Sequence, residues 1–349
     1  MSKLESQNGA PTMAEIARRC RLSKATVSRA LSLPAERCLV KPRTREQIIR
    51  VAKKLGYRPN WRARAFSRQK THTVGLIITG LLPQHEAIPH QILEAFTSIL
   101  RVSGYHLALV PVDGAFDWRD LVFGGHVDGC ATINDEPDEV IAELSRSKMP
   151  AVAMNTSART PLPVVTVDDF QGGQEVGRYL RSLGHRRVAM YVNDAAKPHY
   201  SQEDRLRGVT AGLNGAGDGR ASVQFVRDGH ERAMFRLLDQ RPLPTAIVCY
   251  SHYEALPILK EAWERKIKIP EHLSVITFND VFPLDSTIPS VTRICVPAEK
   301  IGIHAARLLL AQMQKGEQAE PSVQVFPETL VLRESCAPPP PPPPSSEES

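Results

Sequence analysis

The basic residues of this chain are concentrated in one short N-terminal segment, and this uneven charge divides the chain into two parts of different kind. Residues 12–70 hold 17 Lys or Arg against three acidic residues, a local net charge of +14, whereas the whole chain of 349 residues carries +6. Since residues 1–11 contribute no net charge, the remainder carries −8. A basic module of this size favours binding to a phosphate backbone.

The composition excludes several classes of protein. The chain has 42% hydrophobic and 6% aromatic residues, as in a globular protein, and we find no apolar signal core and no run long enough to span a membrane. Its six cysteines form no Cys-x-x-Cys pair, which argues against zinc ribbons and a disulfide framework. No nucleophile motif, phosphate-binding loop or carboxylate pair stands in a convincing context. We therefore predict no catalysis, no metal and no cofactor.

The first half of the basic segment has the pattern of two short helices. Thr12 and Glu15 form a capping box that opens the first helix, and Ser23 is placed to cap a second helix that runs to about residue 32. The outward face of the second helix carries short or basic residues, namely Lys24, Ala25, Ser28 and Arg29. Such a face lets a helix lie deep in a major groove, which is typical of a helix-turn-helix.

A third helix and a shorter fourth one are predicted to follow. Thr44 and Gln47 form a possible capping box, and Gly56 is placed to end the third helix as a C-cap. Asn60 is a candidate cap for the fourth helix, which is too short to be stable alone and contains Phe66. We expect it to order on DNA, with Arg side chains in the minor groove and Phe66 between base pairs.

These motifs resemble the LacI/GalR family of bacterial helix-turn-helix transcriptional regulators. The resemblance is carried by residues 12–16, 22–31, 44–45, 56–60 and 63–64, which occur in family order. It implies an all-α helix-turn-helix head, a hinge helix, and a two-lobed effector-binding core that dimerises on a palindromic operator. A longer stretch at residues 33–42, and Phe66 in place of the usual Leu wedge, depart from the family pattern. The alternative for this segment is a solvated basic bundle that binds RNA, a membrane or an acidic protein surface.

By position, the resemblance assigns residues that contact DNA. Lys24, Ala25 and Arg29 correspond to base readers, and Ser23, Thr26 and Ser28 to phosphate contacts. The full predicted set is Ser23, Lys24, Ala25, Thr26, Ser28, Arg29, Tyr57, Asn60, Ala63, Arg64 and Phe66.

From residue 73 onward, short β-rich runs alternate with helical stretches, which predicts doubly wound parallel sheets. The predicted strands are residues 74–79, 105–112, 127–133, 151–154, 164–167, 188–192, 246–250 and 274–278. About 260 residues exceed one such sheet, so we expect an α/β core of two lobes, like a periplasmic binding protein. The resemblance implies that the chain crosses between lobes near Asp168, near Arg293 and around residues 326–332. The predicted divisions are a disordered N-terminus (1–11), the DNA-binding domain (12–58), a hinge (59–72), the core (73–336) and a Pro-rich disordered tail (337–349).

Ligands bind beyond the carboxyl ends of parallel strands, which places an effector in the cleft between the lobes. Ser201 and Arg205 resemble the family's serine and arginine motif, in which the guanidinium grips ligand hydroxyls or a carboxylate. The alternative for Arg205 is a surface ion pair with Glu203 or a neighbouring acid. The predicted effector-binding set is Ser201, Arg205, His252, Asn279 and Asn155.

Two of these positions depart from the family's usual acids. His252 and Asn279 stand where the family commonly has Asp, and Asn and His supply donors as well as acceptors. A cleft with Arg205 and fewer acids predicts a sugar or sugar-derived effector, with acidic sugars included. Loss of small-molecule control would leave a similar pattern.

The sequence as a whole predicts a DNA-binding transcriptional regulator that acts as a homodimer under the control of a small-molecule effector. Repression is the family's commoner mode, and the expected location is the cytoplasm, at the nucleoid. The alternatives are a solute-binding protein, an effector-independent DNA-binding regulator and an enzyme with a nucleic-acid-binding head. The lack of a signal segment opposes the first of these, and the lack of a catalytic motif opposes the last.

Overall fold

The computed structural model describes residues 11–32, 38–58, 70–80, 87–113, 117–193, 199–215, 221–228 and 231–341. The chain divides into two units, Met1–His72 and Thr73–Ser349. Among the described residues, no helix has both the length and the apolar character needed to cross a membrane.

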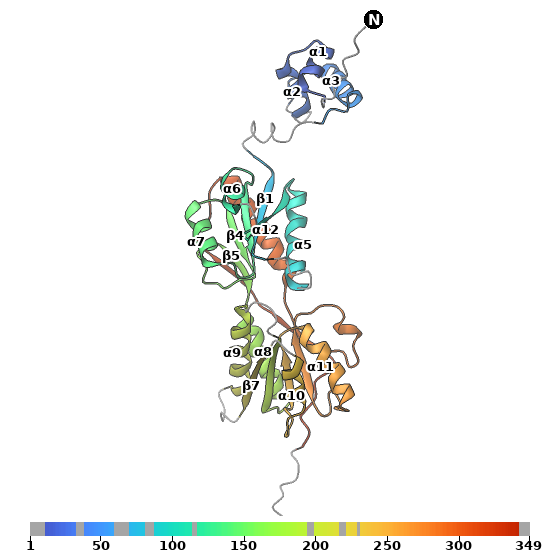
Figure 1. The fold of residues 1–349 in the computed structure, drawn as a ribbon, viewed down its shortest axis with the longest axis vertical. Coiled ribbons are helices and arrows are strands. Elements are labelled where there is room, and N and C mark those ends of the chain that lie inside the picture. Colours follow the sequence, from blue (N-terminus) through green and yellow to red (C-terminus); the bar gives the residue numbers. More distant parts are fainter. Residues whose placement is uncertain are drawn as a thin grey trace, which may run out of the picture. The chain divides into compact units, whose positions relative to one another are not determined.

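The first unit, the head, contains three helices: α1 (Met13–Cys20), α2 (Lys24–Ser32) and α3 (Pro42–Lys54) (Figure 1). Two predicted caps are confirmed, because Thr12 Oγ1 accepts a hydrogen bond from the Glu15 amide at 3.3 Å and Ser23 Oγ accepts one from the Thr26 amide at 3.1 Å. The three helices bury one small apolar cluster, made of Ile16, Ala17, Cys20, Val27, Ala30, Ile48 and Ala52.

The predicted start of the third helix was wrong. α3 begins at Pro42, two residues before Thr44, and its N-cap residue Lys41 makes no side-chain capping bond. Proline suits this position because its fixed φ is helical and it lacks the amide that would be unbonded there. The predicted end is confirmed: Gly56 has φ +65°, and its amide donates to the Lys53 carbonyl at 3.1 Å.

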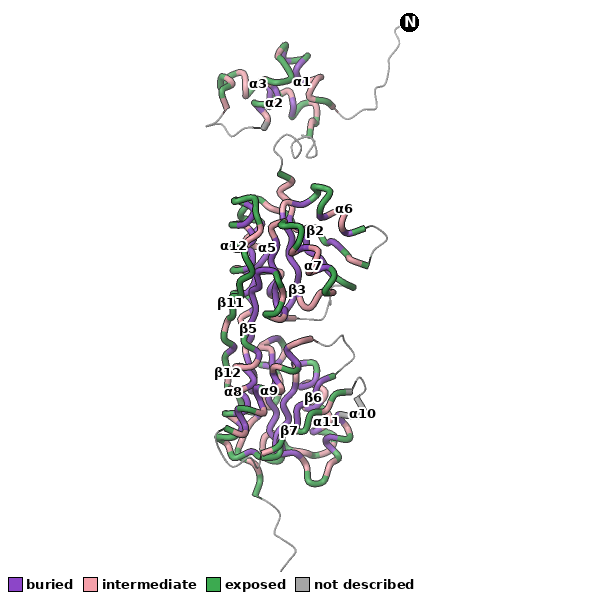
Figure 2. The backbone as a smooth tube through the Cα atoms, turned by 90° about the vertical axis from the view of Figure 1, so that its left-hand side faces the viewer, coloured by how far each residue is buried: buried purple, intermediate pink, exposed green. Residues whose placement is uncertain are grey.

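The second unit contains two six-stranded sheets with helices on both faces (Figures 1 and 2). The first lobe has the sheet order β11-β5-β4-β3-β1-β2, all parallel. Its elements are β1 (Thr73–Ile78), α5 (Ala87–Val102), β2 (His106–Pro111), α6 (Trp118–Phe123), β3 (Gly129–Ile133), α7 (Asp138–Ser147), β4 (Ala151–Met154), β5 (Val164–Val167), α12 (Ala298–Lys315) and β11 (Val323–Phe326). Helices α5 and α12 pack on one face of this sheet, and α6 and α7 on the other.

The second lobe repeats this plan with the order β12-β10-β9-β8-β6-β7, in which only the edge strand β12 is antiparallel. Its elements are α8 (Asp169–Ser182), β6 (Arg187–Asn193), α9 (Ser201–Asn214), β7 (Ser222–Asp228), α10 (Glu231–Leu238), β8 (Ala246–Cys249), α11 (His252–Glu264), β9 (Ser274–Phe278), the short 3-10 helix η2 (Leu284–Ser286), β10 (Thr292–Cys295) and β12 (Thr329–Val331). Helices α8 and α9 cover one face, and α10 and α11 the other.

The predicted α/β core of two doubly wound lobes is confirmed. The chain passes from one sheet to the other after β5 at Asp168, between β10 and α12, and between β11 and β12. Strands β7, β10 and β11 were not foreseen as strands.

The two lobes are in contact through apolar side chains. Val281, on the loop after β9 of the second lobe, packs in the apolar cluster of the first lobe.

The described chain continues in contact with the second lobe beyond residue 336, where the Pro-rich tail was expected to begin. The Ala337 carbonyl accepts hydrogen bonds from Ser274 Oγ and His185 Nε2, each at 3.0 Å, and its amide donates to Ser274 Oγ at 3.1 Å. Ala337 therefore belongs to the folded core, because tertiary hydrogen bonds hold its backbone.

Candidate DNA-binding face and effector cleft

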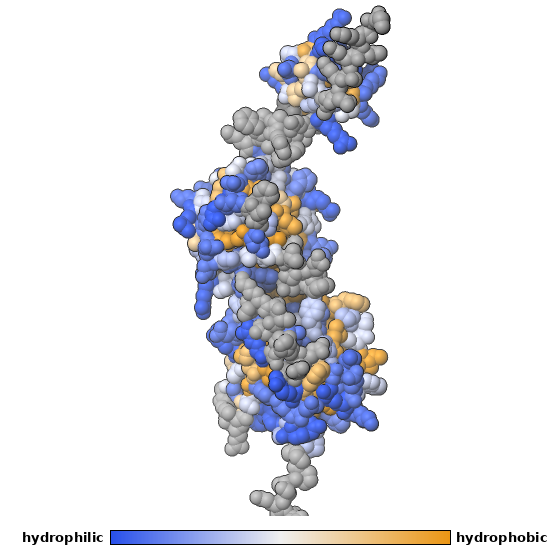
Figure 3. Space-filling view, in the orientation of Figure 1, coloured by the Kyte–Doolittle hydropathy of each residue, from blue (hydrophilic) through white to orange (hydrophobic). Residues whose placement is uncertain are grey.

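Helix α2 has one buried face and one exposed face. Val27 and Ala30 are buried in the cluster of the head, while Lys24, Ala25 and Arg29 are exposed. On the face visible in Figure 3, the head shows mainly hydrophilic residues, with some apolar residues among them. The exposed face thus presents two cations beside a small residue, which suits close approach to DNA.

The remaining predicted DNA contacts differ in their surroundings. Ser23 is exposed, Thr26 and Ser28 are half-buried, and the hydroxyls of Ser23 and Thr26 are 2.9 Å apart. Tyr57, just beyond the end of α3, is half-buried and packs against the apolar cluster of the head. The other predicted contacts, Asn60, Ala63, Arg64 and Phe66, lie outside the described residues.

In the core, three asparagines directly follow strands at the edge where the cleft was predicted. Asn134 follows β3 with φ +61°, Asn155 follows β4 with φ +50°, and Asn279 follows β9 with φ +72°. Asn adopts this left-handed backbone more readily than other residues with a side chain. The chain therefore turns sharply at each strand end and leaves an amide side chain at the edge of the sheet.

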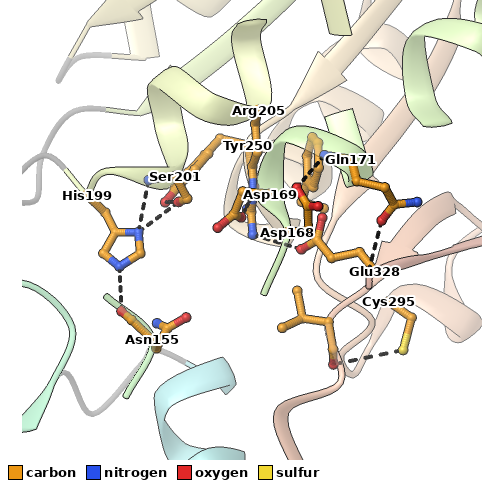
Figure 4. A network of polar contacts seen from close by, with 12 residues as sticks. Asn155, Asp168, Asp169, Gln171, His199, Ser201, Arg205, Tyr250, Cys295 and Glu328 are labelled. Carbon is orange, nitrogen blue, oxygen red and sulfur yellow. Dashed lines mark hydrogen bonds and ion pairs between the residues drawn. The ribbon is translucent and has the colours of Figure 1, made fainter. Parts of the chain in front are cut away.

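Arg205 lies buried in α9 and is paired with two carboxylates (Figure 4). Its Nε donates to Asp169 Oδ1 at 2.7 Å, its Nη2 lies 3.4 Å from Glu328 Oε1, and its Nη1 donates to the Tyr250 carbonyl at 3.1 Å. The guanidinium carbon also lies 4.3 Å from the centre of the Phe278 ring. The alternative of a surface pair with Glu203 is wrong, because Arg205 is only 5% exposed and its partners come from two lobe crossings.

Two acids that the sequence analysis did not name lie in the cleft beside Arg205. Asp169 and Glu328 are both almost fully buried beside Arg205, and neither was foreseen. Burial raises the pKa of Glu328 well above its usual range, although the charge of Arg205 opposes this shift. Burial alone would lower the pKa of Arg205, but the charges of Asp169 and Glu328 raise it above its usual value. The positive charge of the Arg205 guanidinium is thus already balanced by acidic side chains of the protein itself.

The other predicted effector residues fall into two groups. Ser201 Oγ lies 2.7 Å from both His199 Nδ1 and the Tyr250 hydroxyl, and His199 Nε2 lies 3.0 Å from the Asn155 carbonyl. The structure therefore joins Ser201 and Asn155 through His199, a residue that the sequence did not single out (Figure 4).

His252 and Asn279 form the second group, and no hydrogen bond joins them to this network among the described residues. His252 Nδ1 and Asn279 Oδ1 are buried and lack a hydrogen-bond partner within the described part of the chain. Burial lowers the pKa of His252, which favours the neutral imidazole. Asp280, the residue after Asn279, accepts a hydrogen bond from Arg293 Nε. No group of acidic, His and Cys side chains suited to a metal occurs in the described residues.

The raised pKa of Glu328 predicts a pH-dependent stability. The pKa of Glu328 is higher in the folded chain than in the unfolded one, so the protonated side chain stabilises the fold. This contribution to the unfolding free energy is complete below the unfolded pKa of about 4.3 and is lost as pH rises through the folded pKa. We expect the unfolding free energy of the wild type to fall, relative to Glu328→Gln, as pH rises above about 4.3. Urea denaturation across this range measures the difference, with the exposed Glu320→Gln as control. Parallel pH profiles for wild type and Glu328→Gln would contradict the prediction.

Two sequence profiles match the two units of the chain. The profile of bacterial regulatory proteins of the lacI family matches residues 12–60, which include the whole described helix-turn-helix. The profile of the periplasmic binding protein-like domain matches residues 178–336 in the core. The chain belongs to the LacI/GalR family of bacterial transcriptional regulators. Like its relatives, this LacI/GalR member is a DNA-binding transcription regulator rather than an enzyme.

Curated relatives and solved structures of the LacI/GalR family agree with this assignment over nearly the full chain. The HTH-type transcriptional repressor CytR of Escherichia coli K12 is 29% identical over 348 residues, covering 95% of this chain and 98% of CytR. Catabolite control protein A of Staphylococcus aureus is 29% identical over 337 residues, covering 92% and 98%. The lac repressor dimer bound to operator and the anti-inducer ONPF has the same fold, with TM-score 0.79 at 22% identity, covering 94% and 100%. The CelR–cellobiose complex has TM-score 0.64 at 25% identity, covering 93% and 99%.

Proposed function

We propose that this protein represses transcription by binding a palindromic operator as a homodimer, with a small-molecule effector in the interlobe cleft controlling its affinity for DNA. The observation that carries the proposal is α2, a capped helix that buries Val27 and Ala30 and exposes Lys24 and Arg29. One such helix reads one half-site, so a two-fold dimer matches a palindrome. CytR is itself described as a repressor, and the lac repressor structure contains a dimer on operator DNA. We place this activity in the cytoplasm, at the nucleoid.

Exposed apolar residues of the second lobe support dimerisation. Tyr253 and Trp263 on α11, and Phe282 and Ile288 on the following loops, are 43%, 83%, 87% and 97% exposed. Figure 3 shows hydrophobic residues on the side of this lobe that carries α11. Large exposed apolar side chains grouped on one face mark protein interfaces. We propose that this face contributes to the contact with a second copy.

In the head, we propose that Lys24, Ala25 and Arg29 contact base edges, while Ser23, Thr26 and Ser28 contact phosphates. Tyr57, Asn60, Ala63, Arg64 and Phe66 would complete the contacts at the hinge. The hinge set rests on the family resemblance.

The test is selection and sequencing of genomic fragments bound by the full chain at physiological salt. We expect a palindrome, and we expect Arg29→Ala to weaken binding to it by about 1–3 kcal/mol while nonspecific binding is nearly unchanged. Arg50→Ala removes an exposed cation from α3 instead and is the matched control. Equal losses on specific and random DNA would show that α2 is not the reading helix.

For the effector, the cleft favours a neutral ligand that is rich in hydrogen-bond donors, such as an uncharged sugar. Arg205 is countered by two carboxylates, and both Asp169 Oδ2 and Asn279 Oδ1 are buried acceptors without a partner among the described residues. The CelR complex contains cellobiose, which is an uncharged sugar. We expect uncharged sugars, and not their phosphates, to raise the melting temperature. A rise in melting temperature with sugar phosphates alone would contradict this and would favour an acidic effector.

A further inference from the structure

Two consecutive residues of the second lobe reach across to three neighbouring strand ends of the first lobe. His199 Nε2 lies 3.0 Å from the Asn155 carbonyl after β4, and the Tyr200 amide donates to Asp135 Oδ2, after β3, at 3.1 Å. The Tyr200 hydroxyl lies 2.8 Å from Thr166 Oγ1 in β5. These three contacts bridge the two lobes at the edge of the sheet where the effector cleft lies (Figure 4 shows the His199 contact).

The hydrogen-bond roles around His199 are determined by its partners. A carbonyl oxygen only accepts, so His199 Nε2 donates to Asn155, while Nδ1 accepts from the Ser201 amide at 3.4 Å and lies 2.7 Å from Ser201 Oγ. Ser201 Oγ can then accept from the Tyr250 hydroxyl, 2.7 Å away. His199 is thereby oriented by groups of the second lobe and directed at the first.

The receiving groups of the first lobe are themselves held in place. Asn155 Nδ2 donates to Asn134 Oδ1 at 2.8 Å, and Thr156 Oγ1 donates to Asp135 Oδ1 at 2.7 Å. The rings of His199 and Tyr200 lie 4.4 Å apart, and burial raises the pKa of Tyr200 well above its usual value. Hydrogen bonds within each lobe therefore hold both sides of the bridge in place without a ligand.

We propose that His199 and Tyr200 form an internal latch that holds the two lobes closed in the absence of an effector. The groups beneath it, Asp169 and Arg205, are 2% and 5% exposed, so a ligand reaches them only when the lobes separate. Because a ligand that binds a minor, open state has its affinity reduced by the population of that state, the latch sets the concentration at which the effector acts. This inference rests on the proposed function in one respect, namely that the cleft is the effector site.

The latch is tested on the full chain without ligand, by hydrogen exchange with mass spectrometry. Tyr200→Phe removes the hydroxyl that contacts Thr166 and also interacts with Asp169, and His199→Ala removes the contacts to Asn155 and Ser201. We expect each variant to speed exchange about three- to tenfold in residues 134–136 and 155–157 of the opposite lobe, as for loss of one net hydrogen bond. Tyr179→Phe removes a hydroxyl from α8 within the second lobe and is the matched control.

The outcomes separate a latch from a merely structural contact. Faster exchange confined to the two facing edges, with the interiors of both sheets unchanged, supports the latch. Unchanged exchange at residues 134–136 and 155–157, or faster exchange throughout both lobes, overturns it. The operator selection decides the proposed function separately, since a wild type that selects a palindrome remains a regulator whether or not the latch exists.

Discussion

Gly208→Ala is expected to destabilise the core by about 3 kcal/mol or more, although alanine normally favours a helix over glycine by about 1 kcal/mol. Gly208 lies where α9 crosses α8, and a Cβ there would stand 2.2 Å from the Phe170 carbonyl oxygen and 2.9 Å from the Cα of Gly173. Both neighbours are backbone atoms, which cannot move aside without separating the helices. Chemical denaturation of wild type and variant measures the effect.

The same crossing explains why the effect should be large. Gly173 and Gly177 on α8 face Gly208 and Gly212 on α9, and a Cβ at any of the four would approach backbone oxygen at 2.2–2.4 Å. Arg178→Ala, which changes an exposed side chain on α8, is the control and should alter stability by less than about 0.5 kcal/mol. A Gly208→Ala variant as stable as the wild type would show that the two helices do not cross this closely.

Arg205→Ala is expected to lower the unfolding free energy by about 3–5 kcal/mol, because it leaves Asp169 and Glu328 buried without their cation. Since Arg205 also belongs to the predicted effector-binding set, we expect the variant to lose its effector response as well. Denaturation followed by circular dichroism measures the difference.

A neighbouring arginine supplies the matched control. Arg207→Ala lies two residues along the same helix, where its exposed side chain pairs with Asp204, and we expect it to cost about 1 kcal/mol or less. Adding Asp169→Asn and Glu328→Gln to Arg205→Ala should recover part of the loss, since no uncompensated charge then remains buried. Equal effects for Arg205→Ala and Arg207→Ala would contradict the buried ion network.

Features that depend on residues close together in the chain were predictable. Thr12, Ser23 and Gly56 cap or end helices through bonds to residues within a few positions, so their side chains and spacing are sufficient to locate the helix ends. Strands β4, β5 and β9 were predicted at their observed bounds because they are short apolar runs between turns. By contrast, β11 was not predicted, because it is a four-residue edge strand and its first three residues are exposed.

The sequence by itself therefore determined that this protein has a basic three-helix head and an α/β core, because charge, caps and hydrophobic runs act over short stretches of chain. Only the tertiary structure decided what Arg205 and Asn155 contact. Asp169 and Glu328 lie 36 and 123 residues from Arg205, and His199 lies 44 residues from Asn155. Contacts at such separations arise from the packing of helices and the lobe crossings, and no local pattern of residues encodes them.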